Sequence, residues 1–189
     1  LTPYIRSICE DNNGNFWMNQ DRLGVCIYNR FTNQILIGNE QPHLKNMKGL
    51  KEVSCLINLH QSGEIWAGAT TEPIIYIMEK NGQKLNVLRQ ISLIKPNSPE
   101  WVKPYPKLFF EDSSNNLWIA TTMGLYIKNK ESDEIIYISD EFGKINGITQ
   151  TVDGVIWICG DNSMIFKLKR KNADNKFHIE NIDIKEFIS

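Results

Sequence analysis

The sequence predicts an all-β fold made of β-propeller blades, with four repeats of about four antiparallel strands each. The first observation is one phrase that recurs four times and always ends in tryptophan: EDNNGNFW, LHQSGEIW, EDSSNNLW and QTVDGVIW. The second is the spacing of these phrases, since units of roughly 40–50 residues that hold several short strands are typical of propeller blades. The third is that no segment carries a long helical period.

Each repeat keeps the same residue types in register. The motif tryptophans are Trp17, Trp66, Trp118 and Trp157. The residues three positions before them are Gly14, Gly63, Asn115 and Gly154. Gly and Asn accept the positive φ of a tight turn, so a turn is expected before every tryptophan. Because one twisted sheet cannot bury both of its faces alone, we expect the tryptophans to pack between neighbouring blades rather than to bind a ligand.

Four strands are expected in each repeat. Those of the first two repeats are 4–10, 15–19, 25–29, 34–37, then 53–59, 64–67, 74–78 and 85–93. Those of the last two are 107–110, 117–121, 125–128, 134–138, then 145–149, 155–159, 164–169 and 176–182. The dipeptides Asn13-Gly14, Asn81-Gly82 and Asp153-Gly154 favour tight hairpin turns. Residues 43–52 are expected to form a short helical turn or a loop. The blades then span 1–42, 43–94, 95–140 and 141–189 of one propeller segment, 1–189.

Composition argues against two classes of partner. The chain has 41% hydrophobic residues and a net charge of −1, without an apolar run long enough to span a bilayer. Its one dense cationic run, KLKRK at 167–171, follows a strand and is expected to be a solvated edge. Direct contact with nucleic acid is therefore not expected.

The four cysteines give no sign of a metal site. Cys9, Cys26, Cys55 and Cys159 form no CxxC pair, and the three histidines are distant from them in sequence. We expect buried thiols that act as small apolar side chains. A disulfide between neighbouring strands, such as Cys9 with Cys26, stays open at this point. No metal and no cofactor is predicted.

Catalytic patterns are equally sparse. The acid pairs Glu10-Asp11 and Glu111-Asp112 recur at the start of the same turn, where an Asp side chain accepts backbone N–H groups of its own turn. The run DNNGN at 11–15 is a poor calcium loop, since its Gly comes early and the distal Glu is absent. No enzyme is predicted for this segment.

The connection at 95–106, KPNSPEWVKPYP, is the most unusual one in the chain. It carries Trp101 and Tyr105 outside the repeat, on a loop that its prolines stiffen. An aromatic held outward can stack on a sugar, although Trp101 can also fold back onto a neighbouring blade. Asp21 and Arg22, in the turn after the first motif tryptophan, are further ligand-binding candidates.

The repeat resembles the two-component regulator propeller repeat. The third copy is most similar, with Glu111-Asp112, LWIATT at 117–122 and Gly124-Leu125-Tyr126. The first copy keeps Ile8, Glu10-Asp11, Gly14, Phe16-Trp17, Gly24 and Tyr28. The second and fourth copies depart, with Glu72-Pro73 and Ser163-Met164 in place of Gly-Leu. The resemblance covers nearly the whole chain.

This resemblance implies a sensor. In that family the blades form the periplasmic part of membrane-anchored histidine kinases, many of them hybrid two-component systems for polysaccharide utilisation. It implies an oligosaccharide ligand, further blades beyond these four, a homodimer, and a membrane reached only through the rest of the parent protein. Two other functions stay open: a protein-interaction scaffold, and a carbohydrate-active enzyme, which requires two carboxylates about 5–10 Å apart in a cleft.

Overall fold

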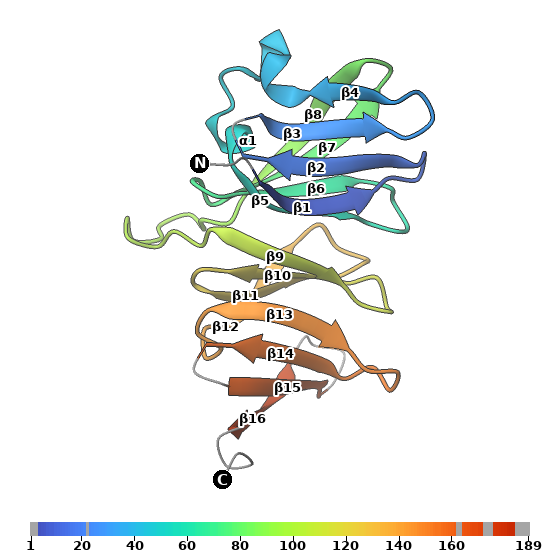
Figure 1. Ribbon diagram of the computed structural model, residues 1–189. Coiled ribbons are helices and arrows are strands. Elements are labelled where there is room, and N and C mark those ends of the chain that lie inside the picture. The colour runs from blue at the N-terminus through green and yellow to red at the C-terminus, as the bar shows by residue number, and fades with distance from the viewer. Residues whose placement is uncertain (1–3, 22, 162–163, 172–175, 184–189) are drawn as a thin grey trace. The chain divides into compact units, whose positions relative to one another are not determined.

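The computed structural model describes residues 4–21, 23–161, 164–171 and 176–183 (Figure 1). The chain divides into two compact units, Leu1–Lys107 and Leu108–Ser189. The chain forms four sheets, numbered 1 to 4 here in chain order. Unit 1 holds sheets 1 and 2, and unit 2 holds sheets 3 and 4 apart from the first two residues of sheet 3. Within the described ranges, no helix has the length and apolar character needed to cross a membrane.

Every sheet has four antiparallel strands in simple up-and-down order. Sheets 1 and 2 comprise β1 (Ile5–Glu10), β2 (Asn15–Gln20), β3 (Gly24–Asn29), β4 (Gln34–Ile37), β5 (Val53–Asn58), β6 (Ile65–Ala69), β7 (Ile74–Asn81) and β8 (Lys84–Ser92). Sheets 3 and 4 comprise β9 (Pro106–Glu111), β10 (Leu117–Thr121), β11 (Gly124–Lys128), β12 (Ile135–Ser139), β13 (Ile145–Gln150), β14 (Ile156–Gly160), β15 (Met164–Arg170) and β16 (Phe177–Asp183). One sheet lies within each expected blade range.

The only helical segments in the described residues lie between β4 and β5. They are η1 (Gly38–Glu40), η2 (Pro42–Leu44) and α1 (Lys48–Lys51), each a single turn. The position three residues before each motif tryptophan is left-handed, with φ of 74° at Gly14, 68° at Gly63, 62° at Asn115 and 83° at Gly154. The turn that precedes each tryptophan therefore has the same backbone form in all four sheets.

The side of a sheet that carries its motif tryptophan is called its front face here, and the other side its back face. Neighbouring residues of a strand alternate between the two faces. Trp17, Trp66 and Trp118 are at most 1% exposed. Trp157 is only half-buried. No described residue covers the front face of sheet 4, so the packing of Trp157 between blades stays a prediction.

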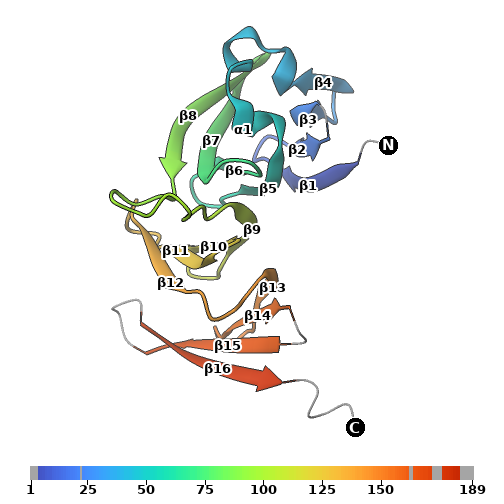
Figure 2. The ribbon, with the colours of Figure 1, turned by 90° about the vertical axis from the view of Figure 1, so that its left-hand side faces the viewer.

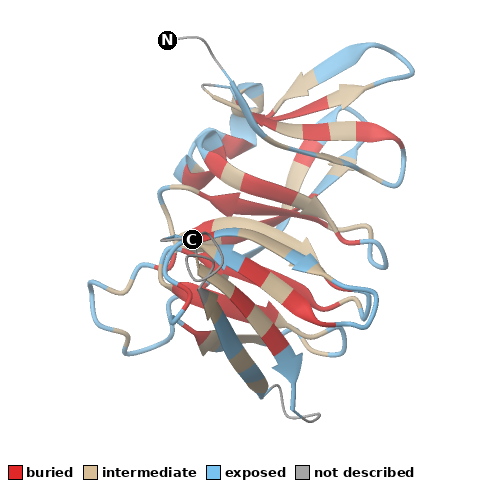
Figure 3. Ribbon diagram, turned by 60° about the horizontal axis from the view of Figure 1, so that its bottom comes forward, coloured by how far each residue is buried: buried red, intermediate tan, exposed pale blue. Residues whose placement is uncertain are grey.

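Each unit has its own core, formed where a front face meets a back face. In unit 1 the front of sheet 1, with Trp17 and Ile27, packs on the back of sheet 2, with Ala67 and Met78 (Figure 2). In unit 2 Trp118 packs with Phe166 and other residues of sheet 4. Figure 3 shows buried residues concentrated in the strands and exposed residues in the turns.

All four cysteines are free thiols. Cys26 and Cys55 are buried and Cys9 is partly buried, whereas Cys159 is exposed, contrary to expectation. Burial raises the pKa of Cys9 and Cys55 to about 12 and that of Cys26 to about 11. Cys9 pairs with Trp17 in the ladder, while Cys26 pairs with Met18. Cys9 and Cys26 thus lie on opposite faces of sheet 1, which excludes the disulfide left open above.

Candidate functional site

The motif aspartate of the first repeat holds its turn and its tryptophan together. Asp11 Oδ1 accepts the backbone N–H groups of Asn13 and Asn15, both at 2.9 Å. Asp11 Oδ2 accepts Trp17 Nε1–H at 2.8 Å and Asn15 Nδ2–H at 2.9 Å. Burial alone would raise the pKa of Asp11, but the hydrogen bonds from Trp17, Asn15 and Asn13 lower it below its ordinary value.

The third repeat reproduces this cluster atom for atom. Asp112 Oδ1 accepts the backbone N–H groups of Ser114 and Asn116 at 2.9 Å, and Asp112 Oδ2 accepts Trp118 Nε1–H at 2.9 Å. Asn116 Nδ2 donates to both carboxylate oxygens. Since both oxygens are already engaged by several donors, these carboxylates serve the fold and are poorly suited to bind a substrate or a metal.

The second and fourth repeats lack the aspartate. In the second, Trp66 Nε1 donates to Glu64 Oε2 at 3.1 Å. The acceptor for the indole therefore lies two residues before the tryptophan, whereas the motif aspartate lies six residues before it. In the fourth, Thr151 Oγ1 bonds to Asp153 and to the Val155 carbonyl. No described residue accepts a hydrogen bond from Trp157 Nε1.

A small polar cavity lies beside the turn in each unit. In unit 1 it measures about 200 Å³ and runs from Asp11 and Asn12 to Gly63 and Glu79. In unit 2 it measures about 140 Å³ and runs from Asp112 to Gln150 and Arg170. The sequence did not predict either cavity, because the walls of each are formed by the turn of one sheet and by residues of the next sheet.

The connection between β8 and β9 carries the most exposed tryptophan of the described residues. Trp101 is 72% exposed and does not fold back as a plug. Backbone hydrogen bonds from Ser98 to Lys95 and from Val102 to Pro99 give the loop two tight turns. Pro104 is buried at its end. The indole is therefore held outward by an ordered loop.

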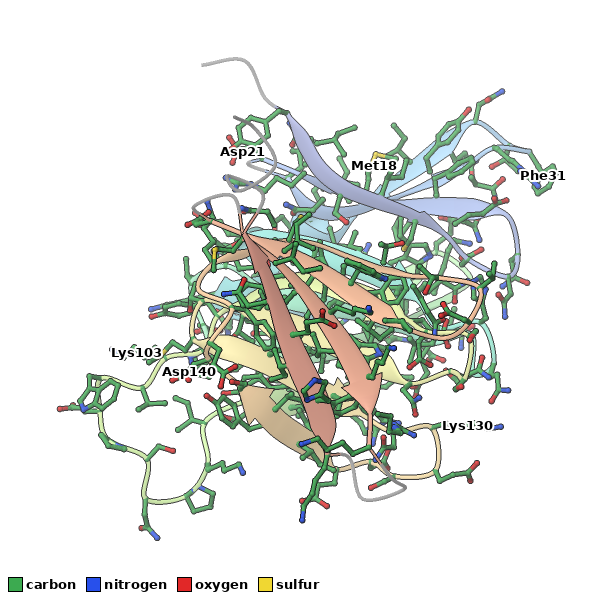
Figure 4. The ribbon with its side chains drawn as sticks, turned by 90° about the horizontal axis from the view of Figure 1, so that it is seen from below. Met18, Asp21, Phe31, Lys103, Lys130 and Asp140 are labelled. Atoms are coloured by element: carbon green, nitrogen blue, oxygen red, sulfur yellow. The ribbon has the colours of Figure 1, made fainter. Side chains whose placement is uncertain are left out.

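Two of the other predicted ligand-binding residues, Tyr105 and Asp21, lie at the same end of unit 1. Tyr105 is half-buried at the base of the loop, where its backbone N–H bonds to the Lys103 carbonyl at 2.9 Å. Asp21 is half-buried in the β2–β3 turn, anchored by its N–H to the Tyr4 carbonyl. Figure 4 places Asp21 and Lys103 at one end and Phe31 at the other. Among the described residues, Trp101 and Asp21 form no hydrogen bond with each other, and Arg22 lies outside the described residues.

The aspartates of the motif turns are not suited to general acid catalysis. The hydrogen bond from Thr151 lowers the pKa of the exposed Asp153, and the pKa of Asp11 is lowered too, whereas a general acid needs a raised one. Among the residues that the structure describes, no group of three or more His, Cys, Asp or Glu side chains could hold a metal ion.

Comparison with known proteins gives a family match at the start of the chain and a fold for nearly all of it. Residues 1–19 match the two component regulator propeller family. No curated protein sequence matches the chain. Among solved structures, the extracellular domain of a protein described as a hybrid two component system from B. thetaiotaomicron is similar at 18% identity and a TM-score of 0.65, over 97% of this chain and 23% of that one.

Propeller enzymes are similar to the same degree. A streptogramin B lyase matches at 17% identity and a TM-score of 0.65, over 94% of this chain and 53% of that one. The periplasmic gluconolactonase of Pseudomonas aeruginosa matches at 9% identity and a TM-score of 0.65, over 96% of this chain and 54% of that one. The chain thus spans from about a quarter to about half of the length of these proteins.

These matches confirm the predicted fold class and the predicted resemblance. The four sheets are β-propeller blades, and at identities this low the structural matches carry the fold alone. The repeat that opens the chain, residues 1–19, is similar to the two component regulator propeller repeat.

Proposed function

We propose that the chain is a non-catalytic sensor segment of a hybrid two-component system, which lies in the periplasm and helps to recognise an oligosaccharide. The family match at residues 1–19 and the fold shared with an extracellular sensor domain support the sensor role. The observation that carries the ligand class is the outward Trp101 on its proline-rich loop. Membrane attachment and the kinase belong to the rest of the parent protein.

The physical argument rests on a preordered aromatic surface. An exposed indole presents a flat apolar face that stacks on the C–H face of a pyranose ring. Because the loop already has two hydrogen-bonded turns, little conformational entropy is lost when it holds a ligand. Tyr105 and Asp21 supply polar groups for sugar hydroxyls at the same end of unit 1, and Arg22 follows Asp21 in the sequence.

The test is a binding titration of the chain against plant and host oligosaccharides, followed by calorimetry on Trp101→Ala. Loss of an aromatic anchor is expected to weaken binding at least about tenfold. Phe31→Ala is the matched control, since Phe31 is 70% exposed but lies at the opposite end of sheet 1 (Figure 4). Equal weakening by both substitutions, or none by Trp101→Ala, would overturn the assignment of the site.

The alternative function is that of an enzyme, because a lyase and a gluconolactonase have structures similar to this chain. The same oligosaccharides incubated with the chain are expected to release no new reducing ends. Release that follows the purified chain through chromatography would replace sensing by hydrolysis.

A further inference from the structure

A groove opens between the last strands of sheets 3 and 4, β12 and β16. It measures about 390 Å³ and is lined by Tyr137, Ile138, Lys171, Lys176, Phe177 and Ile179. Each of these strands stands at the edge of its sheet, so the groove lies at the outer edge of the packed pair (Figure 2). Both walls belong to unit 2. The volume falls within the range of about 300–1,000 Å³ that is typical of small-molecule sites.

The same place in unit 1 is closed by the chain itself. Leu85 and Phe177 are equivalent, since each pairs with the residue three positions after the ladder partner of a motif tryptophan. His43 Nε2–H donates to the Leu85 carbonyl at 2.8 Å, and Leu85 is buried. His43 belongs to the connection 38–52, whereas the matching connection of unit 2 is only 140–144. This shorter connection leaves the groove open and Phe177 half-buried.

The two lysines of the groove are cross-strand neighbours. The Lys171 backbone N–H donates to the Lys176 carbonyl at 2.8 Å and so closes the ladder of the β15–β16 hairpin. Like charges set opposite each other on neighbouring strands are destabilising. Neither lysine forms an ion pair with a carboxylate of the described residues, whereas Lys128, Lys130 and Lys167 each have one. An anion between the two ammonium groups would offset their repulsion.

The rest of the lining is largely aromatic and apolar. Phe177 packs edge-on against Trp118, with ring centroids 5.1 Å apart, and the Arg170 guanidinium carbon lies 5.7 Å from the centre of the Phe177 ring. The Phe177 ring is therefore held by its neighbours. Ile138 and Ile179 extend the apolar surface. Flat apolar surface beside positive charge suits a ring-shaped molecule that carries an acidic group.

A carboxylate that contacts the lining lies at the other end of unit 2. The Tyr137 hydroxyl donates to the carboxylate of Asp140, which lies at the end opposite to Lys130 (Figure 4). The Arg170 side chain donates to Asn129, the neighbour of Lys130, so the hairpin with the two groove lysines lies at the Lys130 end. Among the described residues, the hairpin end of the groove is therefore positive.

We propose that this groove binds an acidic sugar, one that carries a carboxylate or a sulfate. The acidic group lies between Lys171 and Lys176, whose long side chains can both reach it, and the apolar face of the sugar ring lies on Phe177. The small-molecule size of the groove favours a sugar over an acidic protein segment. Trp101 belongs to unit 1, so this site does not depend on a ligand at Trp101.

The test is calorimetric titration of the full chain carrying Trp101→Ala, so that the site proposed above does not contribute. Three disaccharides are compared: one with a glucuronate, one with a sulfate and one neutral. At least one acidic disaccharide should bind about tenfold more tightly than the neutral one, and its affinity should fall as NaCl rises from about 50 to about 300 mM. Equal affinities, or no binding of either acidic disaccharide at about 1 mM, would overturn the proposal.

Substitution of the two lysines locates the site. Lys171→Gln together with Lys176→Gln should weaken the acidic disaccharide at least about tenfold, whereas arginine at both positions should preserve its binding. Lys130→Gln is the matched control, because Lys130 is exposed at the same end of unit 2 and outside the groove. An equal loss in the control, or none in the glutamine pair, would place the acidic sugar elsewhere.

Two further measurements guard the interpretation. The urea midpoint of the glutamine pair should not fall below that of the unaltered chain, because a like-charge pair has been removed. A fall would assign the lost binding to altered folding and the lysines to the fold. A peptide of two glutamates should bind more weakly than the acidic disaccharide. Tighter binding of the peptide through the same lysines would reassign the groove to an acidic protein segment.

Discussion

In the first and third repeats, one aspartate in each repeat holds the motif tryptophan by a hydrogen bond. Asp112 is 8% exposed and joins its turn, Asn116 and the Trp118 indole. The spacing of the aspartate predicted its role as a turn cap. Its bond to the indole six residues later could not be predicted without the strand geometry that brings the two side chains to one face.

Asp112→Ala is expected to lower the free energy of unfolding by about 2–4 kcal/mol, because several buried donors lose their acceptor together. Urea denaturation followed by tryptophan fluorescence measures this change. Ser113→Ala, an exposed neighbour in the same turn, should change it by less than about 0.5 kcal/mol. Similar midpoints for the two variants would show that the cluster contributes little.

Acid sensitivity is expected from Asp11. Its pKa is lowered on folding, so its contribution to stability is present above the ordinary value of 3.8 and is lost as pH falls through the lower folded value. Urea midpoints should therefore fall as pH drops below about 4. Asp11→Ala should flatten that dependence. An equally steep acid loss in the variant would assign the effect to other carboxyl groups.

At the scale of the element, turn residues and alternation of apolar side chains were enough to place all sixteen strands close to their observed bounds. Alternation also separates Cys9 from Cys26, because Trp17 and Met18, their ladder partners, point to opposite faces. The exposure of Trp157 was not predictable from its motif, since burial of a front face depends on the sheet that follows it.

The β10–β11 hairpin gives a prediction at this scale. Gly124 has φ of 120°, and a Cβ there would lie 2.6 Å from the Ser139 carbonyl oxygen. Gly124→Ala is expected to cost about 2–4 kcal/mol of unfolding free energy, since backbone must shift. Gly82→Ala also has positive φ, but its Cβ would meet nothing within 4 Å, so about 1 kcal/mol is expected. Equal costs in thermal or urea unfolding would contradict the close approach.

At the scale of the whole molecule, the tryptophans are of two kinds, those inside the repeat motif and Trp101 outside it. In the repeat motif, Trp17 and Trp118 pack two sheets together within a unit, Trp66 is buried, and Trp157 is half-buried. Trp101 stands outside the repeat and is exposed on an ordered loop. The sequence could single out Trp101 because it breaks the pattern, but whether it pointed outward depended on the anchoring of Pro104 and the loop's own turns.

Iodide quenching of tryptophan fluorescence tests this separation most directly. Because Trp17, Trp66 and Trp118 are buried and Trp157 is half-buried, Trp101 should supply the largest part of the quenchable emission. An oligosaccharide that binds the chain is expected to shield this component, and Trp101→Phe should abolish both the component and its shielding. Binding that leaves the quenchable emission of Trp101 unchanged would contradict the account.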